Sequence, residues 1–112
     1  MKLIHADELH ETGVSHNARI RKRSMLEMGD AGPIVNYARA VFPPGERAGA
    51  HRHGDLIEVF TVESGEGEIR VDGEVYPFCP GTTAVVEPGE VHELINTGRS
   101  EWVVSYFSVL TR

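Results

Sequence analysis

The stretch that decides the fold is residues 45–65, which read GERAGAHRHGDLIEVFTVESG. His51 and His53 stand two positions apart, so an extended backbone would project both imidazoles from the same side. Glu58 follows after a short Gly-Asp turn and places a carboxylate on the neighbouring stretch. A bare His-x-His pair is a weak signal, because surface histidines and hydrogen-bonded core histidines are common.

A second stretch, residues 81–96, reads GTTAVVEPGEVHELIN and supplies a third histidine. His92 comes just after a Pro-Gly turn, where a strand is expected to begin. Imidazole and carboxylate groups together suit divalent first-row metals, namely Fe, Mn, Ni, Zn, Co or Cu. The two stretches together therefore favour a metal site over isolated histidines.

The rest of the chain reads as short strands separated by turns. Valine (13) outnumbers leucine (6), and 12 Gly and six Pro interrupt the sequence at short intervals. Strands are predicted over residues 34–42, 56–63, 68–71, 74–78, 82–86, 92–96 and 102–110. Asp72-Gly73 is a strong two-residue hairpin signal. Such spacing, without a long helix, favours an antiparallel β-sandwich or barrel.

The spacing of the fixed residues resembles the two conserved motifs of the cupin superfamily. The first motif is complete, with Gly45, His51, His53, Glu58 and Gly65. The second has Gly81, Gly89, His92 and Asn96 at the family's offsets. It departs at Glu87, where the family has proline, and Pro88 stands in the next position.

The resemblance implies an all-β fold, a double-stranded β-helix or jelly-roll cupin barrel with a metal inside its mouth. Carried over position by position, the ligands would be His51, His53, Glu58 and His92, holding one divalent transition metal. For Glu58 a role as a base beside the metal is the alternative. Asn96 is expected to tie down a turn.

The chain is expected to form one domain, with the barrel over residues 34–112 and an N-terminal arm and first strand or strands over 1–33. In residues 20–26, the basic Arg21 and Arg23 lie on one alternation, and Ile20, Lys22 and Ser24 lie on the other. They indicate either a small basic patch for an anion or, as we expect, a solvated strand face or extended arm. The three histidines of the arm, His5, His10 and His16, are expected at the surface.

A pocket for a small molecule is expected beside the metal. Phe60 shares the alternation of Glu58, and Leu94 that of His92, so both are candidates for the pocket or for plain core. If the face that carries Tyr37 is internal, Tyr37 would orient the substrate, and we include it in the pocket. The alternation does not say which face of residues 102–110 points inward.

The function indicated is that of a metal-dependent enzyme acting on a small organic molecule, with dioxygenase-like or isomerase/lyase chemistry. The alternative is a non-catalytic, metal-containing small-molecule-binding module. The net charge of −6 argues against nucleic-acid binding, and no apolar run approaches the roughly 18 residues of a membrane span. The single Cys79 cannot form an internal disulfide. We therefore expect a cytoplasmic protein, and open sheet edges suggest a homodimer.

Overall fold

The structure, a computed structural model, describes residues 1–111, and it describes the backbone but not the side chain of His51. Within this part the chain forms a short 3-10 turn and ten strands. In order they are η1 (Ala6–Glu8), β1 (Thr12–Val14), β2 (Asn17–Glu27), β3 (Ile34–Phe42), β4 (Arg47–His51), β5 (Leu56–Ser64), β6 (Gly67–Val71), β7 (Glu74–Phe78), β8 (Thr83–Val86), β9 (His92–Ile95) and β10 (Trp102–Leu110). Among the described residues, no helix is long and apolar enough to cross a membrane.

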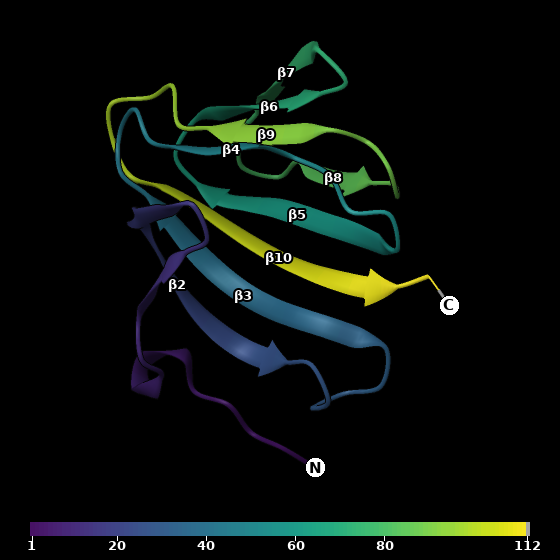
Figure 1. Cartoon of the computed structure of the whole chain (residues 1–112). Coiled ribbons are helices and arrows are strands. Elements are labelled where there is room, and N and C mark those ends of the chain that lie inside the picture. The colour runs from purple at the N-terminus through teal and green to yellow at the C-terminus, as the bar shows by residue number, and fades with distance from the viewer. Residues whose placement is uncertain (112) are drawn as a thin grey trace.

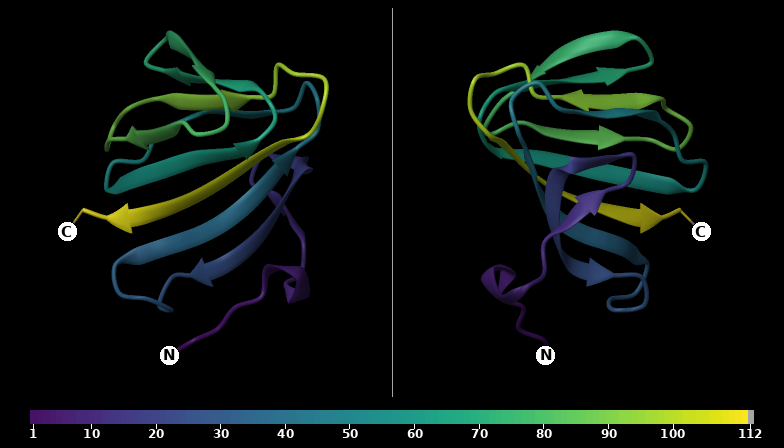
Figure 2. Two further views of the ribbon diagram at one scale, coloured as in Figure 1. Left: turned by 180° about the vertical axis from the view of Figure 1, so that it is seen from behind. Right: turned by 60° about the vertical axis from the view of Figure 1, so that its left-hand side comes forward.

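The strands form two antiparallel sheets that face each other (Figure 1). The larger sheet has the order β1-β2-β3-β10-β5-β8, and the smaller has the order β4-β9-β6-β7. The long strands β3, β10 and β5 lie side by side, and the β1–β2 hairpin folds across one side of the barrel (Figure 2). Both sheets also pair strands that are far apart in the chain, such as β3 with β10 and β4 with β9, and the topology is that of a jelly roll. The predicted all-β barrel is confirmed.

The predicted strands agree closely with the strands of the structure. β3, β7 and β10 have the predicted bounds, and β5, β6, β8 and β9 differ by one residue at one end. Asp72 and Gly73 have φ of 49° and 84°, as their two-residue hairpin requires. The main addition is β2, which pairs with β3 over most of its length and so belongs to the barrel sheet.

One end of the barrel is filled by an aromatic core. Trp102 opens β10 opposite Phe42 and is 0% exposed. Its indole Nε1 donates a hydrogen bond to the Phe78 carbonyl oxygen at 3.2 Å, which satisfies the buried donor. The rings of Phe42 and Phe78 pack edge-on against it, with centroids 4.9 Å and 6.0 Å away. This packing closes one end of the interior.

The interior becomes polar toward the other end of β10. Val104 and Ser108 share the inward face of Trp102, and both are 1% exposed. The antiparallel register places Ser108 between Asn36 of β3 and Glu58 of β5. The same sheet therefore presents apolar side chains to the core at one end and polar ones to a site at the other.

Candidate metal and ligand site

The centre of the candidate site is a buried pair formed by Glu58 of β5 and His92 of β9. Their exposed fractions are 7% and 1%. Nε2 of His92 lies 3.0 Å from Oε1 of Glu58. Burial of a carboxylate is costly unless a cation or hydrogen-bond donors compensate its charge. The surroundings of Glu58 must therefore supply positive charge or hydrogen-bond donors.

The backbone fixes the tautomer of His92. Its Nδ1 lies 3.2 Å from the carbonyl oxygen of Glu90, which can only accept, so Nδ1 carries a hydrogen and donates it. In the neutral ring Nε2 then presents a lone pair to the Glu58 carboxylate, which also presents lone pairs. At 3.0 Å this contact requires a proton or a metal ion between or beside the two atoms.

The proton alternative is reflected in the pKa of His92. Burial lowers this pKa, but the hydrogen bonds with Glu58 and with the Glu90 carbonyl, together with the negative charges of both residues, raise it overall. A position that stabilises a proton on Nε2 also favours another cation. Metal-binding histidines commonly have this arrangement, with the second ring nitrogen donating to a carbonyl.

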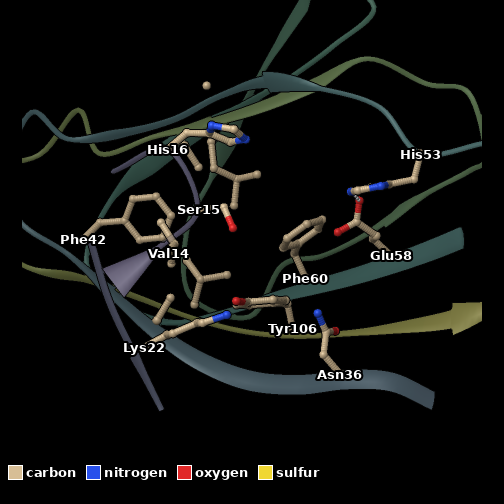
Figure 3. A pocket seen from close by; sticks show the side chains of 15 residues that line it. Val14, Ser15, His16, Lys22, Asn36, Phe42, His53, Glu58, Phe60 and Tyr106 are labelled. Atoms are coloured by element: carbon tan, nitrogen blue, oxygen red, sulfur yellow. Dashed lines mark ion pairs between the residues drawn. The ribbon is translucent and has the colours of Figure 1, made fainter. Parts of the chain in front are cut away.

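His53 approaches the same carboxylate oxygen from the segment after β4. Its Nε2 lies 3.6 Å from Oε1 of Glu58, and Figure 3 shows the two side chains pointing toward one another. The carbonyl oxygen of His53 accepts a hydrogen bond from Gly89 N–H at 2.8 Å, which ties this segment to the turn before His92. Two imidazoles thus converge on Oε1 of Glu58.

The turn before His92 also accommodates the departure from the second motif. The N–H of Glu87, where the family has proline, donates to the Glu90 side chain at 2.7 Å. Gly89 has φ of 84°, a left-handed conformation that favours glycine. The Glu90 carboxylate therefore stabilises the turn, while its carbonyl orients His92.

The fourth expected ligand, His51, is placed only in part. The backbone of His51 pairs with His92 in the β4–β9 ladder. Its side chain lies outside the described residues, so its assignment as a ligand stays a prediction. Without that side chain, the described residues contain no group of three His, Cys, Asp or Glu side chains placed as a ready metal site.

The donor set fits a divalent transition metal. Two donors bound at about 2.1 Å to one ion lie about 3.0 Å apart in octahedral geometry and about 3.4 Å apart in tetrahedral geometry. The contacts of Glu58 Oε1 with His92 and His53, at 3.0 Å and 3.6 Å, are close to these separations. Imidazole nitrogen and carboxylate oxygen are ligands that such metals accept.

A cavity of about 360 Å³ lies beside this centre. Phe60 and Leu94 line it, and Phe60 packs against the His92 ring with centroids 5.8 Å apart. Tyr37 does not line it, and this corrects its assignment to the pocket. Tyr37 lies on the outer face of β3, 39% exposed and edge-on to Phe107, because the inward face of β3 carries the even-numbered residues.

The inward tyrosine is Tyr106 of β10, which stacks on Phe60 and lines the cavity. Burial, and then the negative charge of Glu58, raise the pKa of Tyr106 to about 12. The hydroxyl is therefore a hydrogen-bond donor at all ordinary pH values. The sequence placed Tyr106 on one of two possible faces without deciding between them.

Several polar residues of the cavity were not singled out from the sequence. Lys22, Asn36 and the β1–β2 turn residues Ser15 and His16 line it together with the residues above (Figure 3). His16, expected at the surface, is exposed and forms part of the cavity wall. One sequence signal could have identified Lys22: it lies two residues after the buried Ile20, and therefore on the same inward face of β2.

Comparisons with known proteins agree with this architecture. The family model described as "Cupin domain" matches residues 38–107. An oxalate-binding protein from Thermotoga maritima is 32% identical over 65 residues, which span 58% of this chain and only 54% of that protein.

Two solved structures are similar over nearly the whole fold. A predicted oxalate decarboxylase from Thermotoga maritima superposes with a TM-score of 0.89 at 22% identity, covering 97% of this chain and 99% of that chain. An RmlC-like cupin from Shewanella frigidimarina superposes with a TM-score of 0.81 at 15% identity, covering 100% and 93%. The motifs, the jelly roll and the family match together show that the chain belongs to the cupin family.

Proposed function

We propose that this cupin binds one divalent transition metal through His51, His53, Glu58 and His92 and acts as a metal-dependent enzyme on a small organic molecule. The observation that carries the proposal is the contact between His92 and Glu58. A backbone carbonyl holds the proton on Nδ1, and Nε2 faces a buried carboxylate at 3.0 Å. This contact requires a proton or a metal ion, and the fixed Nδ1 hydrogen orients Nε2 for a metal in advance.

A bound divalent ion would supply Lewis acidity and open coordination positions for a substrate oxygen or for dioxygen. The chain's own residues would do the rest. Phe60 and Leu94 would give one side of the cavity an apolar wall. Tyr106 offers a protonated hydroxyl, and Glu58 can act as a ligand or as a base that accepts a substrate proton.

The reaction class is either isomerase/lyase chemistry or dioxygenation. Two relatives carry names that concern oxalate, one as a binding protein and one as a predicted decarboxylase. Those names make a small carboxylic acid the first substrate to test. The name of the binding protein also favours the second candidate, a metal-containing module that holds its ligand without turnover.

The test is metal loading followed by parallel assays of binding and turnover. Protein loaded with Mn, Fe, Ni, Co, Cu or Zn is incubated with oxalate and other small organic acids, with detection of carbon dioxide release, oxygen uptake and isomerised product. Turnover that depends on the metal and falls at least about 100-fold in Glu58→Gln supports the enzyme. Tight metal-dependent binding without turnover supports the binding module, and binding that ignores the metal contradicts both.

The homodimer and the cytoplasmic location stay predictions. A monomeric mass in solution would remove the first. The composition disfavours membrane and nucleic-acid partners, and both absences likewise stay predictions.

A further inference from the structure

Lys22 places a positive charge inside the cavity. It lies on β2 two residues after Ile20, which is 0% exposed, and it shares the inward face of that residue. It is half-buried and lines the cavity that also contains Glu58 and His53. In Figure 3 its side chain runs toward Tyr106.

The ammonium group has no acidic partner in the part of the chain that the structure describes. Two neighbouring arginines do have one: Arg21 pairs with Glu11 at 3.1 Å, and Arg39 pairs with Glu63. None of the described residues forms an ion pair with Lys22. A cation that faces an interior cavity without a carboxylate is costly unless solvent or a ligand completes it.

The charges of the cavity wall favour an anion with two charged groups. Glu58 contributes one negative charge and Lys22 one positive charge, and the proposed divalent ion adds two more positive charges. Two positive charges are then in excess. A ligand with a carboxylate at each end would neutralise them.

The register locates Lys22 and Glu58 at different places on the inner face. Lys22 lies opposite Ala40 of β3, and this row continues through Val104 of β10 to Val62 of β5, four residues from Glu58. Three strand steps of about 4.8 Å and four residues of about 3.3 Å separate the two Cα atoms by about 20 Å on a flat sheet.

Side chains that extend toward one another across the inner face would shorten that distance by about half. If each extends about 5 Å toward the other, about 10 Å remain between the ammonium and an ion at Glu58. Contacts of about 2–3 Å at each end leave about 5 Å between the two contacting ligand oxygens. Oxalate is too short, whereas a five-carbon dicarboxylate has this span. The cavity volume of about 360 Å³ also exceeds what a two-carbon acid fills.

We propose that the cavity selects an extended organic acid, with one end at the metal and a second carboxylate held by Lys22 and Tyr106. The inference deepens the proposed function, since it names the substrate class of the same site. Lys22 is the specificity-determining residue. Tyr106 donates a hydrogen bond to the same carboxylate.

The test compares ligands that differ in one charge or in length. Isothermal titration with Mn²⁺-loaded protein measures the affinity for glutarate, glutaric monoamide and oxalate. Wild-type protein should bind glutarate at least about tenfold more tightly than the monoamide or oxalate, because one charge-assisted contact is lost with either. Lys22→Met, which keeps the length of the side chain, should abolish this preference. The matched control is Arg21→Gln, which removes the same charge from the outer face of β2 and should leave the preference unchanged.

The inference would be overturned if the wild type bound glutarate and its monoamide with equal affinity, or did not bind glutarate. It would also be overturned if Lys22→Met changed the affinity for both ligands equally. The same titration in metal-free protein separates the two proposals. If the protein binds no Mn²⁺ but Lys22→Met still weakens the binding of glutarate, the carboxylate contact of Lys22 stands and the metal proposal fails. If Mn²⁺ binds and the preference is absent, the reverse holds.

Discussion

Replacing Asn96 tests how the second motif holds the barrel together. Asn96 follows β9 and is 1% exposed. Its Nδ2 donates to the carbonyl oxygens of Phe42 and Ser100, and its Oδ1 accepts from Gly98 N–H, each at 2.9 Å. The side chain thus joins the end of β3, the end of β9 and the loop before β10.

Asn96→Ala removes all three hydrogen bonds and leaves buried backbone groups without partners. At about 0.5–1.5 kcal/mol for each hydrogen bond, and more where a buried group loses its partner, the expected loss is about 3 kcal/mol. The assay is urea unfolding of metal-free protein, followed by the fluorescence of Trp102, the one tryptophan in the chain. The control is Asn17→Ala, which also removes three side-chain contacts. Those with the Arg47 carbonyl and Arg19 N–H are exposed and that with Glu46 is long, at 3.5 Å, so together they should contribute less than about 1 kcal/mol.

Asn96→Asp adds a test of the direction of these bonds. The carboxylate keeps the acceptor for Gly98 N–H but faces two carbonyl oxygens, so the folded state should raise its pKa above the unfolded value of about 3.9. The stability of this variant relative to wild type should be greatest below pH 4 and fall as pH rises through the folded-state pKa. A loss below about 1 kcal/mol in Asn96→Ala, or no pH dependence in Asn96→Asp, would refute this reasoning.

Three other predictions concern Ser108, Gly65 and Tyr106. Ser108 lies opposite Glu58, and its Oγ has no hydrogen-bond partner among the described residues, so Ser108→Ala should leave metal-free protein as stable or more stable in urea. If the hydroxyl supports Glu58 in the loaded state, the same variant should bind the metal about tenfold more weakly, and an unchanged metal affinity would exclude that support. Gly65 has φ of 85°, and a Cβ there would meet a backbone carbonyl oxygen at 2.4 Å, whereas Gly73 has φ of 84° and open space around it. Gly65→Ala should therefore lower the free energy of unfolding clearly more than Gly73→Ala, for which a loss of about 1 kcal/mol is expected. Equal losses in urea unfolding would contradict the close approach. Tyr106 has a pKa of about 12, so as pH rises the unfolded state loses the tyrosine proton before the folded state does. The free energy of unfolding should therefore fall between pH 10 and 12, by up to about 2–3 kcal/mol. Tyr106→Phe should remove this part of the loss, and an unchanged pH profile in that variant would contradict the prediction.

The sequence was most informative where one face of a strand is apolar and turn residues mark its ends. β3, β7 and β10 were predicted with their bounds, and the hairpin at Asp72-Gly73 was identified from two residues. Here a buried face, a solvent face and a turn that requires positive φ all agree. The pair Glu58 and His92 was likewise found from spacing, and the structure brings its two side chains together.

The parts that sequence reasoning missed have a common physical cause. The inward face of β2 changes from Ile20 to Lys22, because it passes from the core to a cavity that is polar. Alternation between apolar and polar residues therefore disappears where the site begins. Tyr37 was assigned to the wrong face because both faces of β3 carry residues that could be inward, and only pairing with β10 decides between them.

The central claim is that the histidines and the carboxylate hold one metal ion. The most direct measurement is the metal content of protein purified without chelator and then equilibrated with Mn²⁺, by elemental analysis per chain. We predict one divalent ion per wild-type chain, retention in His16→Ala, which changes a histidine of the same cavity wall, and loss in His92→Ala and His51→Ala. A wild-type protein without stoichiometric metal, or a His92→Ala protein that keeps it, would contradict the metal site.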